Sequence, residues 1–282
     1  MSRLVRVSLV FAALACLLLF GVGSANANTL GSIFVTGHDP DFHSQLGPNP
    51  VGAQNIIDLG LNFVRNGNTA PILFLETSPG PNNALGDHTD SEGGLLVSGY
   101  SSGSTPGNHF VMVNATQFAS ADFSLYSAIF LPSDHGGSLT GDDLAAVNAR
   151  SGDIINYING GGGLMALAED GFHAGPAEPL FGFLPFLVTS TAFSEFEGGN
   201  TLTAAGAALG LNNSDINGNF SHNIFTATGG MNIVDTDSRG EILSLDFRGQ
   251  VTSTGVAPEP TSLALFGSGL MCCLWKLRRK LA

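Results

Sequence analysis

The sequence predicts an α/β domain with a doubly wound, mostly parallel sheet and helices on both faces of that sheet. A strand, helix, strand unit stands at its centre: an apolar run over residues 128–131, helical spacing over 140–159, and a second apolar run over 164–168. The same order occurs earlier, in residues 32–36, 51–65 and 72–75. Short apolar runs without alternation are typical of parallel strands that helices cover on both faces.

The first part of the chain predicts two strands joined by a helix. The strands are residues 32–36 and 72–75, and the helix over 51–65 has apolar residues at the spacing of one buried face. Residues 78–91 predict a loop because Pro, Gly and Asn are frequent there. We expect further strands over 95–97 and 109–113 and a short helix over 117–123.

The central helix has clear start and stop signals. Thr140 is a good N-cap, and Asp142 and Asp143 follow in the first turn, where the helix dipole favours acidic residues. Ser151 and Gly152 are expected to divide the helix in two, and the glycines of 160–163 end it. The strand after it is expected over residues 164–168.

The last part of the body predicts smaller elements. Residues 181–186 are apolar and aromatic, which is typical of core. We expect a strand over 187–191, a short helix over 201–209 and a polar loop over 215–223. Residues 232–234 and 242–245 predict a hairpin around the polar turn 235–240.

The composition separates the chain into four segments. Residues 1–27 combine two arginines, an apolar run and the small residues Ala25-Asn-Ala27, which is the pattern of a signal peptide. We expect an exported α/β domain over 28–251, a linker over 252–257 and a sorting tail over 258–282. All three cysteines lie outside the exported domain, so it has neither a disulfide nor a cysteine ligand.

The charge of the chain limits its partners. The formal net charge is −13, and residues 28–251 contain no lysine. Such a surface repels nucleic-acid phosphates, so no nucleic-acid partner is expected. It suits an exported protein or one that binds cations.

The C-terminal tail resembles the PEP-CTERM sorting signal. The motif Pro258, Glu259 and Pro260 precedes an apolar run over 261–275 and a basic end formed by Lys276, Arg278, Arg279 and Lys280. The apolar run predicts a short transmembrane helix whose basic end stays cytoplasmic. The resemblance implies an inner-membrane precursor, processing by an exosortase, and delivery to the cell envelope, surface or exopolysaccharide (biofilm) matrix.

The body is similar in topology to the class I glutamine amidotransferase-like fold, a flavodoxin-like arrangement. Pro132 with Gly136 and Gly137 resembles a loop of that family, and Glu169 follows a strand where the family has its nucleophile elbow. The resemblance places His222 where the family has its histidine. The domain has no cysteine, however, so amidotransferase activity is not expected.

Several metal-ligating residue types follow the predicted strands. Carboxyl ends of parallel strands meet at one edge, where α/β sheets bind ligands. Imidazole with carboxylate suits zinc, iron or manganese, whereas carboxylate and carbonyl oxygen suit calcium. A divalent cation is therefore one possible cofactor; the alternative is a turn in which Asp39 and Asp41 bond their own backbone. The candidate ligands are His38, Asp39, Asp41, His43, Asp134, His135 and Glu169.

Two hypotheses for the function stay open. The first is a non-catalytic exported protein whose domain binds a ligand, a glycan or a cation. The second is a metal-dependent or serine hydrolase of surface polysaccharide or peptide, with Ser133, Glu169 and His222 as candidate catalytic residues. The acidic and amide residues of 215–219 and 235–237 resemble fragments of calcium loops, but the closing glutamate is missing, which favours Asx turns instead.

Overall fold

The computed structural model describes residues 30–77, 91–135, 139–170, 179–184, 188–252 and 255–256. The predicted signal peptide, the loop over 78–90, Gly136 and Gly137, and the tail beyond residue 256 lie outside this description. Within the described part of the chain, no helix has the length and apolar character needed to cross a membrane.

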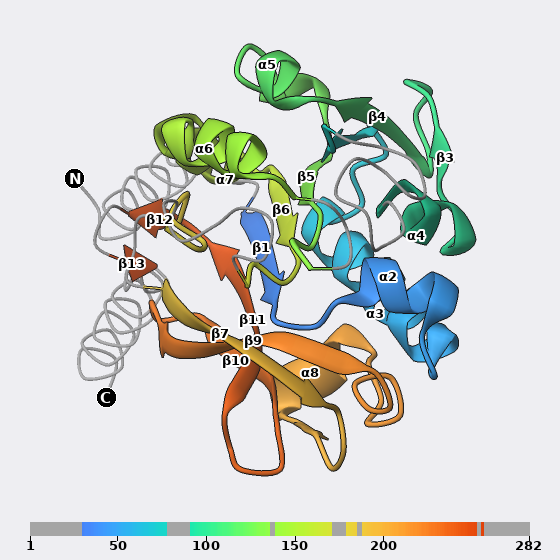
Figure 1. Cartoon of the computed structure of the whole chain (residues 1–282). Coiled ribbons are helices and arrows are strands. Elements are labelled where there is room, and N and C mark those ends of the chain that lie inside the picture. The colour runs from blue at the N-terminus through green and yellow to red at the C-terminus, as the bar shows by residue number, and fades with distance from the viewer. Residues whose placement is uncertain are drawn as a thin grey trace, which may run out of the picture.

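A large mixed sheet forms the centre of the molecule (Figure 1), and its parallel half agrees with the prediction. Six strands run parallel in the order β3-β4-β2-β5-β6-β1. The four apolar runs predicted as strands over 32–36, 72–75, 128–131 and 164–168 are neighbours there. The bounds are β1 Gly31–Thr36, β2 Ile72–Leu75, β3 Ser101–Ser102, β4 His109–Val113, β5 Ala128–Leu131 and β6 Gly163–Ala166.

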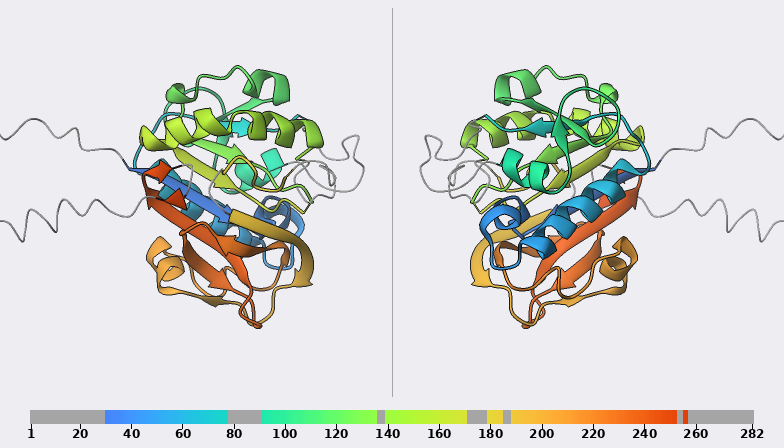
Figure 2. Two further views of the ribbon diagram at one scale, coloured as in Figure 1. Left: turned by 90° about the vertical axis from the view of Figure 1, so that its left-hand side faces the viewer. Right: turned by 90° about the vertical axis from the view of Figure 1, so that its right-hand side faces the viewer.

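Helices cover both faces of the parallel strands, and this produces two cores. Along β1, Ile33 and Val35 face the core under α6 (Gly141–Ala149) and α7 (Ser151–Asn159), whereas Phe34 faces the core under α3 (Pro50–Arg65). Successive side chains of a strand point to opposite faces, so every central strand contributes to both cores. In Figure 2, α3 lies in front of the strands in the right-hand view and behind them in the left-hand view.

The other half of the sheet is antiparallel. β11 (Ile242–Gly249) pairs with β1, and β10 (Asn232–Thr236) and β8 (Thr201–Leu202) extend the sheet beyond it. The predicted hairpin over 232–245 is therefore present. β9 (Phe220–Thr228) pairs with β11 and with β7 (Val188–Phe196). Helix α8 (Ala204–Leu209) packs against β10, with Thr203 as its N-cap. β12 (Val251–Thr252) and β13 (Gly255–Val256) form a separate small pair.

The predicted helix signals act as expected around Thr140. Its hydroxyl accepts a hydrogen bond from the N–H of Asp143, and the Asp143 carboxylate accepts one from the N–H of Thr140, which is a reciprocal capping box. The helix is divided, with α6 ending at Ala149 and α7 beginning at Ser151.

Four local predictions were wrong. Residues 95–97 lie in helix α4 (Ser91–Val97), because the Glu76 carboxylate accepts the N–H groups of Ser91 and Glu92 and fixes the first turn. Residues 117–123 are not one helix. Caps at Asn114 and Asp122 instead start α5 (Ala115–Phe118) and the 3-10 turn η1 (Phe123–Leu125).

The other two errors concern residues at the edge of the sheet. Residues 220–223, predicted as loop, begin β9, and their polar side chains are buried by hydrogen bonds to other segments. The turn that was the alternative interpretation for the segment after His38 is instead helix α2 (Pro40–Leu46), in which Pro40 takes the first helical position that proline favours.

Candidate metal centre

Four segments that are distant in the sequence meet at the carboxyl edge of the parallel strands. The ends of β1, β5 and β6 are joined by backbone hydrogen bonds, from Asp134 N–H to the Ala168 carbonyl (2.7 Å) and from Ala168 N–H to the His38 carbonyl (3.3 Å). β9 reaches the same edge because the N–H of His222 donates to the Gly37 carbonyl at 2.7 Å. The side chains that follow these strands are therefore held close together.

Three buried side chains form the centre of this edge. Asp39, His43 and His222 each offer one ligand atom, and the three atoms lie within 4.8 Å of one another. The Nε2 of His222 is 3.6 Å from the Oδ2 of Asp39. The three residues come from the end of β1, from α2 and from β9, respectively. Two imidazoles and one carboxylate are a ligand set that suits zinc, iron or manganese.

His43 is the most unusual member of the set. It is only 5% exposed, and neither of its ring nitrogens has a hydrogen-bond partner among the described residues. Its ring stacks on Phe220 and meets the edge of Phe42. Burial lowers the pKa of His43 to about 4, so the imidazole is neutral at physiological pH. Neutral imidazole is the form that binds metals.

Asp39 lies among other acids, and no lysine or arginine of the described residues pairs with it. Burial, and then the nearby Asp41 carboxylate, raise the pKa of Asp39 well above its usual range. The hydroxyl of Ser133 lies 2.8 Å from Asp39 Oδ1 and 2.7 Å from Asp41 Oδ1, and the Ser133 N–H donates to Asp41 Oδ2. Ser133 thus links two carboxyl groups, and Asp41 also accepts a hydrogen bond from the hydroxyl of Ser91.

Asp170 and His135 lie on the outer side of His222. The Oδ2 of Asp170 is 2.9 Å from His135 Nδ1 and 3.8 Å from His222 Nδ1, and these three residues form a second cluster of ligand-type atoms. The rings of His135 and His222 are stacked, 4.1 Å apart and 14° from parallel. Rings stacked in this way lie in nearly parallel planes, so lone pairs in those planes do not meet at one ion. Asp170 bonds to His135 and lies beside the Nδ1 of His222 at more than hydrogen-bond distance.

His38 points away from this centre. Its Nδ1 is 2.6 Å from Glu197 and its Nε2 is 2.8 Å from Asp235, and all three side chains are buried. Burial alone lowers the pKa of His38, but the two carboxylates outweigh it and raise the pKa to about 10. His38 is thus a buried imidazolium that joins β1 to β10 and to the residue that follows β7.

The remaining predicted site residues lie at the same edge but in other environments. Glu169 is fully buried, and its Oε2 accepts the N–H of Phe181. Burial raises the pKa of Glu169 to about 8, with a further contribution from the charge of Asp134. Asp134 is buried just beyond the end of β5.

The two segments that resemble calcium loops are held by hydrogen bonds within the protein. Asp215 accepts hydrogen bonds from Asn55 and from the N–H of Asn212, and Asp237 accepts the N–H groups of Arg239 and Glu241. Asp237 accepts the N–H two residues ahead, as an Asx turn does, whereas Asp215 is held by Asn55 and by the N–H of Asn212, so the Asx alternative is confirmed only at Asp237.

Sequence reasoning missed three residues of this region. Asp170 lies just beyond the end of β6, and that position was the available signal for it. Asp235 was considered only as part of a turn, and Glu197 follows β7 in a segment without any recognisable motif. Only the fold brings Glu197 and Asp235 to His38.

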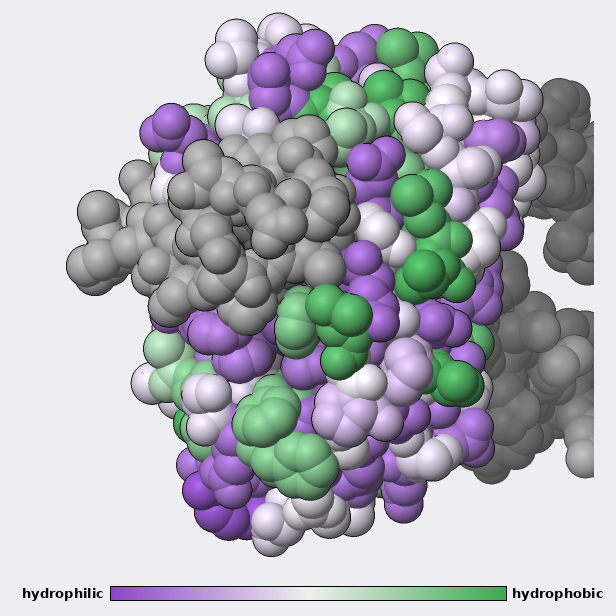
Figure 3. Space-filling view, turned by 45° about the vertical axis from the view of Figure 1, so that its right-hand side comes forward, coloured by the Kyte–Doolittle hydropathy of each residue, from purple (hydrophilic) through white to green (hydrophobic). Residues whose placement is uncertain are grey.

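On the described part of the face in Figure 3, apolar side chains form small separate patches among polar ones. Scattered patches of this kind are normal for a soluble surface. That face therefore gives no reason to place the function on a broad apolar area.

Comparisons with known proteins match the C-terminal tail to a family and match the rest of the chain to none. A family model described as the PEP-CTERM protein-sorting motif matches residues 256–280. No curated protein and no solved structure matches the chain. The similarity of the body to amidotransferases therefore has no support from these comparisons. The sorting motif indicates an exported, envelope-associated protein that exosortase processes.

Proposed function

We propose that the exported domain, residues 28–251, is a non-catalytic envelope protein that binds a divalent transition-metal ion through Asp39, His43 and His222. The observation that supports this most is the state of His43. Burying a polar group without a hydrogen bond costs about 1–3 kcal/mol, so proteins rarely keep one without a use. A metal ion would give His43 the partner that it lacks among the described residues.

The charges around the centre support a cation as the ligand. Asp39, Asp41 and Asp170 lie near one another, and the domain has no lysine to offset them. Carboxyl groups that share a site repel one another's negative charge, which raises their pKa values. A bound divalent ion would relieve that repulsion and favour the ionised form of Asp39.

The ligand types favour one class of ion. Two imidazoles and one carboxylate suit zinc, iron or manganese, whereas calcium takes six to eight oxygen ligands. Asp170 would lie outside the coordination shell, where its Oδ2 bonds to His135 at 2.9 Å and adds negative charge near the ion.

A second candidate function follows from the number of ligands. Three protein ligands leave a coordination position for water, as in catalytic zinc sites. This favours a metal-dependent hydrolase of surface polysaccharide or peptide over the serine hydrolase alternative, because the Ser133 hydroxyl bonds to two carboxyl groups. Hydrolysis of peptide or polysaccharide that requires zinc and stops in the His43→Leu variant would establish this second candidate.

The tail gives the domain its destination. We propose that the precursor is held in the inner membrane by the helix over 261–275, is cleaved near Pro258–Pro260, and reaches the envelope, surface or exopolysaccharide matrix. The matched motif at 256–280 supports this order of events. The domain would then meet its ion outside the cytoplasm.

Metal binding can be tested on the full-length protein after chelator treatment. We expect zinc or manganese to bind in calorimetric titration and calcium to bind far more weakly. His43→Leu should abolish this binding, whereas His109→Gln should not, because His109 lies on β4 and pairs with Ser101. Equal binding by the wild type and the His43→Leu variant, or no binding of zinc or manganese, would refute the proposal.

A further inference from the structure

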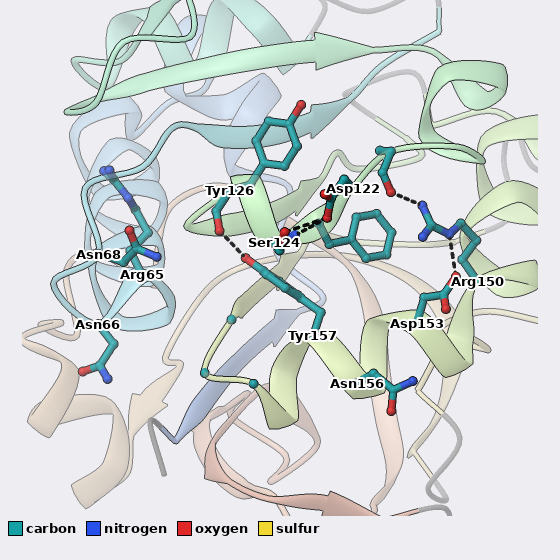
Figure 4. Close-up of a pocket in the computed structure, with 15 residues that line it drawn as sticks. Arg65, Asn66, Asn68, Asp122, Ser124, Tyr126, Arg150, Asp153, Asn156 and Tyr157 are labelled. Atoms are coloured by element: carbon teal, nitrogen blue, oxygen red, sulfur yellow. Dashed lines mark hydrogen bonds and ion pairs between the residues drawn. The ribbon is translucent and has the colours of Figure 1, made fainter. Parts of the chain in front are cut away.

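A hollow opens at the edge of the sheet opposite the candidate metal centre, where the parallel strands begin (Figure 4). Its volume is about 530 Å³. Its walls come from the end of α3, from the segment before β5, from α7, and from the glycines before β6. This volume lies within the range of about 300–1,000 Å³ that is typical of small-molecule sites.

The guanidinium groups of both arginines at this hollow already make hydrogen bonds within the protein. Arg65 is buried, and its guanidinium donates to Ser127, Asn108 and the carbonyls of Ala70 and Gly107. Arg150 donates to Asp153 and to two backbone carbonyls, and it also lies over the ring of Phe123. An anionic ligand would therefore have to break existing bonds.

The two carboxylates at this hollow also have partners within the protein. Asp122 caps the turn η1 by accepting the N–H and the hydroxyl of Ser124, and these bonds lower the pKa of Asp122. Asp153 pairs with Arg150 at 2.9 Å. Two arginines and two aspartates line the hollow, so their formal charges cancel, in a chain whose net charge is −13.

The lining groups that remain uncommitted are neutral and polar. The side chains of Asn66 and Asn156, the Nδ2 of Asn68 and the hydroxyl of Tyr126 make no hydrogen bond within the described parts of the chain. Figure 4 shows Asn66 and Asn68 on the α3 side of the hollow and Asn156 on the α7 side. Amides and hydroxyls both donate and accept, so together they match a ligand with several neighbouring hydroxyl groups.

We propose that this hollow binds a neutral saccharide. The amides of Asn66, Asn68 and Asn156 would bond to its hydroxyls, and the half-buried rings of Tyr126 and Tyr157 would contact its apolar faces. A charged sugar gains nothing here, because no uncommitted charge faces the hollow from the described residues that line it. The site is independent of the metal centre, which lies at the other edge of the sheet.

The test is calorimetric titration of the full-length protein in a sugar-free detergent. The probes are maltohexaose, cellohexaose, a mannan hexasaccharide, glucose and hexagalacturonate. We expect at least one neutral hexasaccharide to bind, and chelator to leave that binding unchanged. Binding of glucose with equal affinity would identify a free sugar as the ligand, and binding of the hexasaccharide alone would identify a polymer. Both results support the proposal.

Two variants decide whether this hollow is responsible. Asn156→Ala should weaken binding about threefold to tenfold, the effect of losing one hydrogen bond, and alanine keeps α7 helical. Asn62→Ala is the matched control, because Asn62 is an exposed amide on α3 outside the hollow. The proposal is overturned if no neutral probe binds, if hexagalacturonate binds most tightly, or if Asn156→Ala binds like the wild type.

Discussion

Replacement of His43 by leucine should make the protein more stable without metal and less stable with it. His43 is 5% exposed, and its ring nitrogens have no hydrogen-bond partner among the described residues. Removing such a polar group and filling the space with an apolar one relieves about 1–3 kcal/mol. For a domain of this size, that corresponds to a rise in melting temperature of about 2–12 °C in the presence of chelator.

Zinc should reverse the order of the melting temperatures of the wild type and the His43→Leu variant. An ion that binds only the native state adds about 4 kcal/mol at a thousandfold excess over its dissociation constant. The wild type should gain this stabilisation, which corresponds to about 8–16 °C, and the His43→Leu variant should gain none. A variant that melts above the wild type in chelator and below it in zinc indicates that His43 is kept for binding at a cost in stability.

The assay measures the thermal unfolding of both proteins by calorimetry, once in chelator and once in zinc. His109→Gln controls for the loss of a histidine elsewhere in the domain, since His109 hydrogen-bonds to Ser101 away from the centre. Equal stabilisation of the wild type and of His43→Leu by zinc would refute the role of His43 as a ligand. A large loss of stability of His43→Leu in chelator would refute the argument that its imidazole is unsatisfied.

Three further predictions concern other parts of the chain. His38→Gln should lower the free energy of unfolding by about 3–5 kcal/mol in urea titrations in chelator, because Glu197 and Asp235 lose their buried partner; a loss below about 1 kcal/mol would contradict this. The pKa of Glu169 is about 8 in the folded protein and 4.5 in the unfolded chain, so the folded state binds the proton more tightly. The free energy of unfolding should therefore fall as the pH rises from about 4.5 to about 8. Glu169→Gln should remove this loss of stability, which amounts to about 3 kcal/mol in the free energy of unfolding at pH 7. If the variant keeps the pH dependence of the wild type, this prediction is wrong. Changing residues 258–260 to alanine should leave export intact and hold the protein in the inner membrane; recovery of processed protein outside the membrane would show that the motif is not needed.

Local patterns in the sequence were sufficient for the central strands of the parallel half and for the helix that follows β5. The apolar runs 72–75 and 128–131 are strands with the predicted bounds, and Thr140 caps the predicted helix. These features depend on neighbouring residues, because burial of a short strand and capping of a helix are visible in consecutive side chains. The same holds for the sorting tail, whose motif, apolar run and basic end are contiguous.

Local patterns failed where hydrogen bonds from distant segments decide the structure. Residues 95–97 are apolar like a strand, yet the Glu76 carboxylate holds the segment as helix α4. Residues 220–223 are polar like a loop, yet Ser221 bonds with His38 and Asn223 donates to the Glu169 carbonyl, which buries the start of β9. Neither effect leaves a periodicity in the sequence.

The sequence alone determined that histidines and carboxylates gather at the carboxyl edge of a parallel sheet, because parallel strands with crossover connections must all end on one side. It did not determine which of them face one another. His38 and Asp39 are adjacent in the chain, yet His38 is directed to Glu197 and Asp235, while Asp39 is directed to Ser133 and His222. Neighbouring side chains on extended backbone point in opposite directions, and their partners lie far away in the sequence. The tertiary structure therefore decided that Asp39, His43 and His222 form the candidate centre and that His38 stands outside it.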